Sequence, residues 1–106
     1  MSYRWPNKDK DEQLDYSVDW SRWLGDGVTI SVVNWFVDDS AGVKTAFTAG
    51  GVVNGLQNVA VTQTSTIATI NLALGTNNTE YKLHCRITDS SGSIAERTIK
   101  LRIKEQ

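Results

Sequence analysis

The stretch Thr79–Ile103 limits the possible folds of this chain more than any other part of the sequence. Apolar and polar residues alternate along it on both sides of a short polar turn. The apolar positions are Tyr81, Leu83, Cys85 and Ile87 before the turn, and Ile99, Leu101 and Ile103 after it. A period of two is typical of β-strands with one buried face and one wet face. Asp89–Gly92 supplies turn residues, so the two strands should pair as a hairpin.

Five further short strands are expected upstream of this hairpin, separated by turn signals. They fall at 14–20, at 28–37, at 43–48, around Val59 and Val61, and at 66–74, where Ala68, Ile70, Leu72 and Leu74 share one face. Ile30 and Trp35 have opposite parity, which predicts a bulge between them or cover on both faces. We place Trp35 on the core face. About seven short strands at roughly 8–12 residue spacing are typical of an all-β sandwich.

The first 13 residues differ from the rest of the chain. They are strongly charged and contain the only proline, so we expect an extended N-terminal arm at 1–13 with little regular structure and one domain at 14–106. Tyr3 and Trp5 are large aromatics in this arm. We expect them to dock either on the domain or on a partner, since aromatic side chains are enriched at contact surfaces.

Charge is sparse and uneven. The net charge is -1, which gives no electrostatic case for binding nucleic acid or an anionic membrane. The chain also has no apolar run of 18 residues for a membrane span. Gly27–Thr79 contains only three charged residues, Asp38, Asp39 and Lys44. Such a surface suits packing against neighbouring subunits, although short β sequences are often rich in threonine for other reasons.

No catalytic, metal or cofactor motif is present in the sequence. His84 is the only histidine, and its strand parity directs it away from Cys85, so these two should not form a dyad. Cys85 is the only cysteine and is expected to be an inert core residue. The acidic residues Asp9, Asp11, Glu12, Asp15 and Asp19 lack the glycine and distal glutamate of a calcium loop. We therefore predict that this protein is not an enzyme and needs no cofactor.

Two blocks of the sequence are similar to a known family in order and spacing. The first contains Trp5-Pro6, Lys8-Asp9, Asp11-Glu12, Leu14-Asp15-Tyr16, Val18-Asp19-Trp20, Trp23-Leu24 and Asp26-Gly27. The second contains Ile67-Ala68-Thr69-Ile70, Gly75-Thr76, Thr79, Tyr81, Arg86-Ile87-Thr88-Asp89-Ser90, Gly92 and Glu96-Arg97-Thr98-Ile99. They resemble the fiber–tail adaptors of tailed bacteriophages, and the resemblance is weakest over Val37–Thr64.

The resemblance implies an immunoglobulin-like antiparallel β-sandwich. Separately, Thr79-Glu80-Tyr81 after Leu74 is similar to the tyrosine-corner region of fibronectin-type sandwiches, where the tyrosine hydroxyl bonds back to the preceding loop. The family resemblance also implies a structural virion protein, made in the host cytoplasm, that links a tail or neck ring to fibers or tailspikes in multiple copies. Tyr3, Trp5, Trp20 and Trp23 are the expected partner-binding anchors. Two alternatives are a capsid decoration (cement) protein and a carbohydrate-binding β module. The buried parity of Tyr16, Trp20 and Trp35 disfavours the carbohydrate-binding module.

Overall fold

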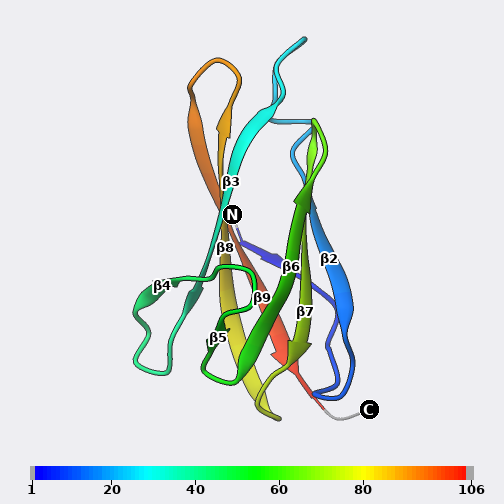
Figure 1. Ribbon diagram of the computed structural model, residues 1–106, viewed down its shortest axis with the longest axis vertical. Helices are drawn as coiled ribbons and strands as arrows, with labels where there is room; N and C mark the ends of the chain where they lie inside the picture. The colour runs from blue at the N-terminus through cyan, green and yellow to red at the C-terminus, as the bar shows by residue number, and fades with distance from the viewer. Residues whose placement is uncertain (1, 105–106) are drawn as a thin grey trace.

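A computed structural model describes the backbone of residues 2–104 and the side chains of residues 4–104. Figure 1 shows two β-sheets packed face to face in an elongated sandwich. The first sheet has the order β1-β9-β8-β3-β4, and the second has the order β2-β7-β6-β5. The strands are β1 (Ser2–Arg4), β2 (Leu14–Asp19), β3 (Ile30–Asp38), β4 (Lys44–Ala46), β5 (Val52–Val53), β6 (Leu56–Gln63), β7 (Ile67–Leu74), β8 (Thr79–Asp89) and β9 (Ile94–Ile103). The all-β sandwich is confirmed, with β1 and β5 added to the expected strands.

The predicted hairpin of β8 and β9 is the longest paired unit of the sandwich. Its register runs without interruption from Thr79↔Ile103 to Thr88↔Ile94. All seven apolar positions that the alternation assigned to its inner face are fully buried or nearly so. Gly92, with a positive φ of 92°, closes the turn between the two strands. This continuous inner face forms one wall of the core.

The strand β3 contains a bulge, which is one of the two explanations that the sequence allowed for the parity of Ile30 and Trp35. Its register with β8 shifts between Ile30 and Val32, and this shift lets Ile30 and Trp35 both face the core. Val37 is buried on the same face. The alternating pattern therefore locates the core side of β3 correctly once one residue is allowed to bulge.

One prediction for the four-stranded sheet is wrong, namely that Leu74 shares the buried face of its strand. Ala68, Ile70 and Leu72 are buried as predicted, but Leu74 is exposed. The backbone of Leu74 has a positive φ of 61°, so the chain leaves the β conformation there and its side chain no longer follows the strand alternation. A second bulge lies between Asn58 and Ala60 in β6.

Tyr81 forms the tyrosine corner that the sequence suggested. Its hydroxyl donates to the carbonyl of Asn54 at 2.6 Å and accepts from the backbone N–H of Thr76 at 2.9 Å. The two bonds tie the loop before β6 to the loop before β8. Gly55 has a positive φ of 84°, and a Cβ there would lie 2.7 Å from the hydroxyl oxygen of Thr76, so a larger residue would disturb this corner.

The N-terminal segment is more ordered than we predicted. Ser2–Arg4 forms β1, which pairs in parallel with β9. The indole ring of Trp5 stacks on Tyr16 with centroids 4.7 Å apart and also approaches Trp35. The expectation of an arm with little regular structure is therefore wrong for these residues, because their aromatic and backbone groups find partners on the sandwich itself.

Lys8 fixes the same segment at a second point. Its side chain is fully buried, and its ammonium donates to the carbonyls of Asp9 at 2.8 Å and Leu74 at 2.7 Å. Burial lowers the pKa of Lys8, partly offset by nearby carboxylates that raise it. Its backbone also bonds to Arg102 and Lys104. Lys8 belongs to the first block that resembles the adaptor family, but it lies outside the predicted strands, so the alternation of the sequence could not predict its burial.

We predict that Tyr81→Phe lowers the free energy of unfolding by about 1–3 kcal/mol, because it leaves two backbone groups without their partner. Urea denaturation would measure the change. Tyr16→Phe is the matched control, since the Tyr16 hydroxyl is buried and has no hydrogen-bond partner among the described residues. Equal losses in the two variants would contradict the importance of the corner.

Candidate interaction surfaces

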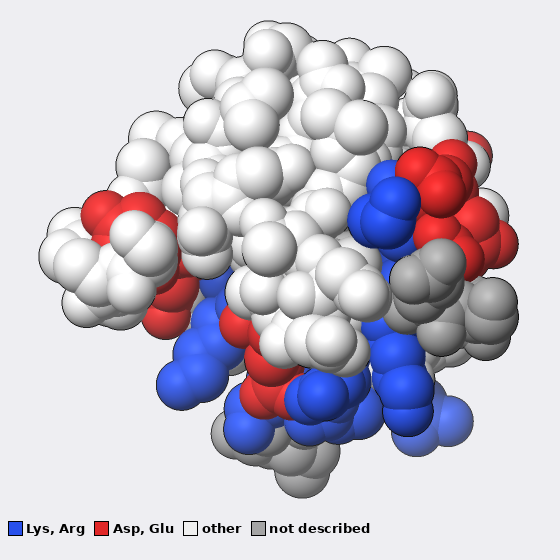
Figure 2. Space-filling model, turned by 90° about the horizontal axis from the view of Figure 1, so that it is seen from below, with Lys and Arg blue, Asp and Glu red and all other residues white. Residues whose placement is uncertain are grey.

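The two sheets differ in the charge of their outer faces. The strand residues of the four-stranded sheet carry charge on this face only at Asp15 and Asp19, which both belong to β2. Thr45–Thr79, a run of 35 residues that supplies β5, β6 and β7, contains no Asp, Glu, Lys or Arg. The outer positions of the five-stranded sheet instead carry Arg4, Asp38, Lys44, Glu80, Lys82, His84, Arg86, Glu96, Lys100 and Arg102. Figure 2 shows the consequence along the long axis: most charged side chains gather toward one side, and a large continuous area carries none.

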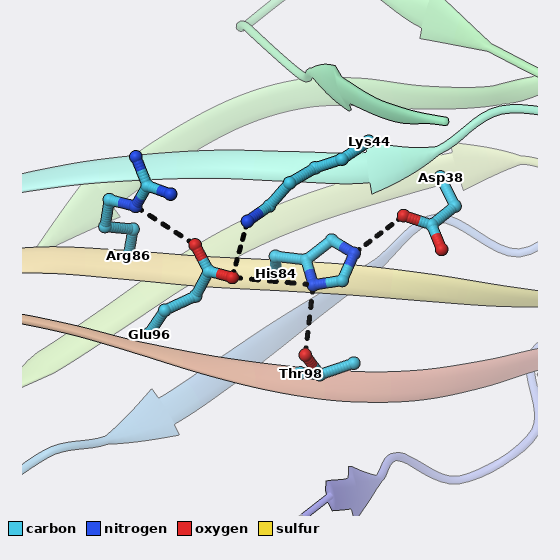
Figure 3. Close-up of polar contacts among 6 residues, drawn as sticks. All are labelled: Asp38, Lys44, His84, Arg86, Glu96 and Thr98. Atoms are coloured by element: carbon cyan, nitrogen blue, oxygen red, sulfur yellow. Dashed lines mark hydrogen bonds and ion pairs between the residues drawn. The ribbon is translucent and has the colours of Figure 1, made fainter. Parts of the chain in front are cut away.

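A hydrogen-bonded network lies on the charged face (Figure 3). The carboxylate of Glu96 on β9 accepts from Lys44 at 2.6 Å and from Arg86 at 3.0 Å. His84 on β8 contacts Asp38 at 2.7 Å and Thr98 at 3.0 Å. The network thus connects four neighbouring strands, β4, β3, β8 and β9, and holds the long side chains in place across the sheet.

The electrostatics of this network centre on Glu96. Burial would raise the pKa of Glu96, but hydrogen bonds and attraction from Lys44 and Arg86 outweigh burial, so its pKa lies below the usual value. The same two cations lie about 5 Å from the ring centroid of Phe36, at 5.2 and 5.0 Å. Hydrogen bonds to Glu96 and contacts with the Phe36 ring therefore restrain Lys44 and Arg86 on this face.

Within the described part of the chain, the histidine and the cysteine point to opposite sides of β8. His84 lies on the outer face and Cys85 is buried in the core, as their alternation predicted. Burial raises the pKa of the Cys85 thiol to about 12, so the thiolate is scarce at neutral pH. Within residues 2–104, no group of three or more His, Cys, Asp and Glu side chains could hold a metal ion. No described helix is long and apolar enough to cross a membrane.

The four expected aromatic anchors differ widely in exposure. Trp20 is only 1% exposed and belongs to the core, while Trp5 is partly buried against that core. Trp23 is 39% exposed and meets Trp20 edge to face at 5.8 Å. The side chain of Tyr3 lies outside the described residues. Trp23 is therefore the anchor whose ring is most available to a partner in this structure.

The local sequence explains the position of Trp23. After β2 the chain turns sharply, and the backbone carbonyl of Trp20 accepts bonds from Trp23 and Leu24 at 2.9 and 3.0 Å. The carboxylate of Asp19 caps the turn by accepting from the Ser21 N–H at 2.9 Å. Trp20 points inward, where the guanidinium of Arg97 lies 4.3 Å from its ring centroid. Because Trp20 occupies the core side of this turn, Trp23 lies on the surface.

The comparison with known families agrees with the resemblance seen in the sequence. Residues 8–102 match the family described as podophage GP4 fiber-tail adaptor protein gp77. The chain belongs to this family. A match over nearly the whole sandwich supports a structural adaptor role in a phage tail and a location in the virion. The comparison with curated proteins found no match.

The positions of two phenylalanines, one on the charged outer face and one in the core, could not be assigned from the sequence. Phe36 was not singled out as the platform under Lys44 and Arg86, because cross-strand contacts of this kind depend on strand register. Phe47 is fully buried beside the end of β4, and its backbone N–H bonds to the carbonyl of Trp35 at 3.0 Å. Apolar and polar residues do not alternate regularly around β4, so the sequence pattern could not predict that Phe47 is buried.

We predict that Glu96→Gln lowers stability at neutral pH and that this difference disappears in acid. The pKa of Glu96 is depressed in the folded state, so its contribution is present above the unfolded-state value of 4.5 and is lost as the pH falls through the folded value. Thermal unfolding from pH 7 to pH 2 would measure it. A difference that stays constant with pH would contradict the proposed charge pairing.

We also predict that Trp5→Ala lowers the free energy of unfolding by up to about 3 kcal/mol, because its ring covers Tyr16 and the core beneath. Trp23→Ala should cost less than about 1 kcal/mol, as is usual for exposed positions. Chemical denaturation of both variants distinguishes a stabilising ring from a surface ring. The opposite order of losses would show that Trp5 is the more dispensable tryptophan.

Proposed function

We propose that this protein is a non-enzymatic adaptor that links the tail or neck ring of a tailed phage to its fibers or tailspikes. The family match over residues 8–102 is the observation that carries this proposal. Several copies would surround the tail axis in each particle. The chain would be made in the bacterial host cytoplasm and incorporated into the virion during assembly.

The two outer faces support a role between two different partners. An adaptor must bind a different protein on each side with high specificity. Two surfaces of different chemistry provide this specificity, because each surface binds one partner better than the other. The uncharged outer face of β6 and β7 is inexpensive to desolvate. The network around Glu96 and His84 presents ordered charges suited to a polar, complementary surface. We assign the two partners to these two faces.

Trp23 is our choice for an aromatic anchor of one contact. It is exposed and held by a tight, capped turn, so little side-chain entropy would be lost on binding. Tyr3 remains a proposed anchor on the basis of its sequence position. The burial of Tyr16, Trp20 and Trp35 favours the adaptor over a carbohydrate-binding module, which needs exposed rings to stack on sugars.

Phage particles assembled without this protein would test the proposal. Such particles should have intact capsids but lack fibers, and adding the purified protein together with fibers should restore them, as seen by electron microscopy. Trp23→Ala should weaken retention of the protein on particles about tenfold, as expected for an anchor residue. Ile94→Ala is the control, because Ile94 is also an exposed apolar residue and belongs to β9 rather than to the turn that carries Trp23.

The same experiment separates the adaptor from the cement alternative. Binding of the purified protein to expanded capsid shells that carry no tail, with normal fibers on particles that lack it, would overturn the adaptor role and favour capsid decoration.

A further inference from the structure

The sandwich is open along one side, where two strand edges are only half paired. β4 pairs with β3 only at Phe36–Asp38, and β5 pairs with β6 only at Leu56 and Gln57. Beyond these short partners, no described strand covers residues 59–63 of β6 or residues 31–34 of β3 on their outer edges. One side-chain bond, from Gln63 to the Ser31 carbonyl at 3.5 Å, spans the opening.

An apolar groove of about 180 Å³ lies between these edges. Val33 and Trp35 line it from β3, Phe47 lines it from the segment after β4, and Val61 lines it from β6. No charged residue contributes to its wall. The groove is therefore an uncovered extension of the hydrophobic core, bordered by strand edges that can accept a further strand.

Val61 lies where β6 has no described neighbouring strand on its outer edge. It is paired with Ile70, which is fully buried, so both side chains face the interior of the sandwich. Val61 is nevertheless 44% exposed, because no described strand pairs with the outer edge of β6 beyond Gln57. A β-branched residue with core parity and surface exposure is what one expects at an edge that another strand covers.

The edge also lacks the usual protection against pairing. Exposed edge strands commonly carry lysine, proline or inward-pointing charges that prevent association. Residues 59–63 read Val-Ala-Val-Thr-Gln and contain none of these, and the uncharged run extends over Thr45–Thr79. The bulge between Asn58 and Ala60 is the one protective feature in this strand. A partner segment that carried charges would bury them without counter-charges here.

We propose that the occupant is the β6 edge of a second copy of this chain. The occupant must be extended, uncharged and unpaired on one edge, and residues 59–63 of another copy have all three properties. Antiparallel pairing about a two-fold axis at Val61 places Ala60 opposite Thr62 of the other copy, with no like charges facing each other. The two four-stranded sheets then join into one, and each copy covers the groove of the other.

This pairing extends the proposed function by naming a contact between adaptor copies. It does not require a particular tail or fiber partner, so it can fail while the adaptor role stands. Conversely, a dimer in solution would remain even if the protein proved to be a capsid decoration protein.

Sedimentation of the full chain across a concentration series tests the pairing. Wild type should dimerise, and Val61→Lys should weaken the dimer at least about tenfold, because two lysines would meet at the two-fold axis. Ile94→Lys is the matched control, since Ile94 is 66% exposed and lies in the other sheet, and it should dimerise like wild type. A wild type that stays monomeric, or a dimer that Val61→Lys leaves intact, overturns the proposal.

A cysteine variant locates the contact directly. Val61→Cys should form a covalent dimer under mild oxidation, while the native Cys85 is buried and should not interfere. Ile94→Cys should form little covalent dimer. Hydrogen exchange of wild type should show protection at residues 59–63 that increases with protein concentration. Protection of these residues only in assembled tails, and not in the purified protein, would show that a different virion protein covers the edge.

Discussion

The antiparallel ladder between β8 and β9 is the constraint on which the rest of this structure depends. Ten consecutive residue pairs hold the two strands in one register, and a slip of one residue would move every apolar side chain to the outer face. That register fixes the inner wall of the core and, with it, the outer face that carries His84 and Glu96. The tyrosine corner at Tyr81 then ties this wall to the loops of the opposing sheet.

The N-terminal segment completes the sandwich instead of extending freely from it. Parallel pairing of β1, the stacked ring of Trp5 and the buried ammonium of Lys8 attach it to both sheets. A buried ammonium is unfavourable unless its donors find acceptors, and two backbone carbonyls supply them here. Residues that look like a solvated tail in sequence are thus part of the folded domain, which leaves the surface turn at Trp23 as the more accessible aromatic.

Segregation of charge links the architecture to the adaptor role. The closing hairpin and the strands β3 and β4 carry the charged network. The strands β5, β6 and β7 contribute no charge. A protein that joins two different virion components benefits from two surfaces with different chemistry. Each surface then has a low affinity for the component that binds the other surface. The half-paired edges of β3 and β6 add a third kind of surface, apolar and rich in unpaired backbone groups.

The sequence by itself determined seven of the nine described strands, the closing hairpin and the buried parity of Trp35 and Cys85, because a period of two is a local property of the chain. It left the bulge in β3 as one of two explanations for the parity of Ile30 and Trp35. The position of Tyr81 after Leu74 indicated the tyrosine corner, and the family resemblance added the adaptor role. Only the tertiary structure decided that Lys8 is buried, that Leu74 is exposed and that Val61 borders an open groove. Each of these depends on which distant segments pair and where pairing stops, and no local pattern encodes such long-range contacts.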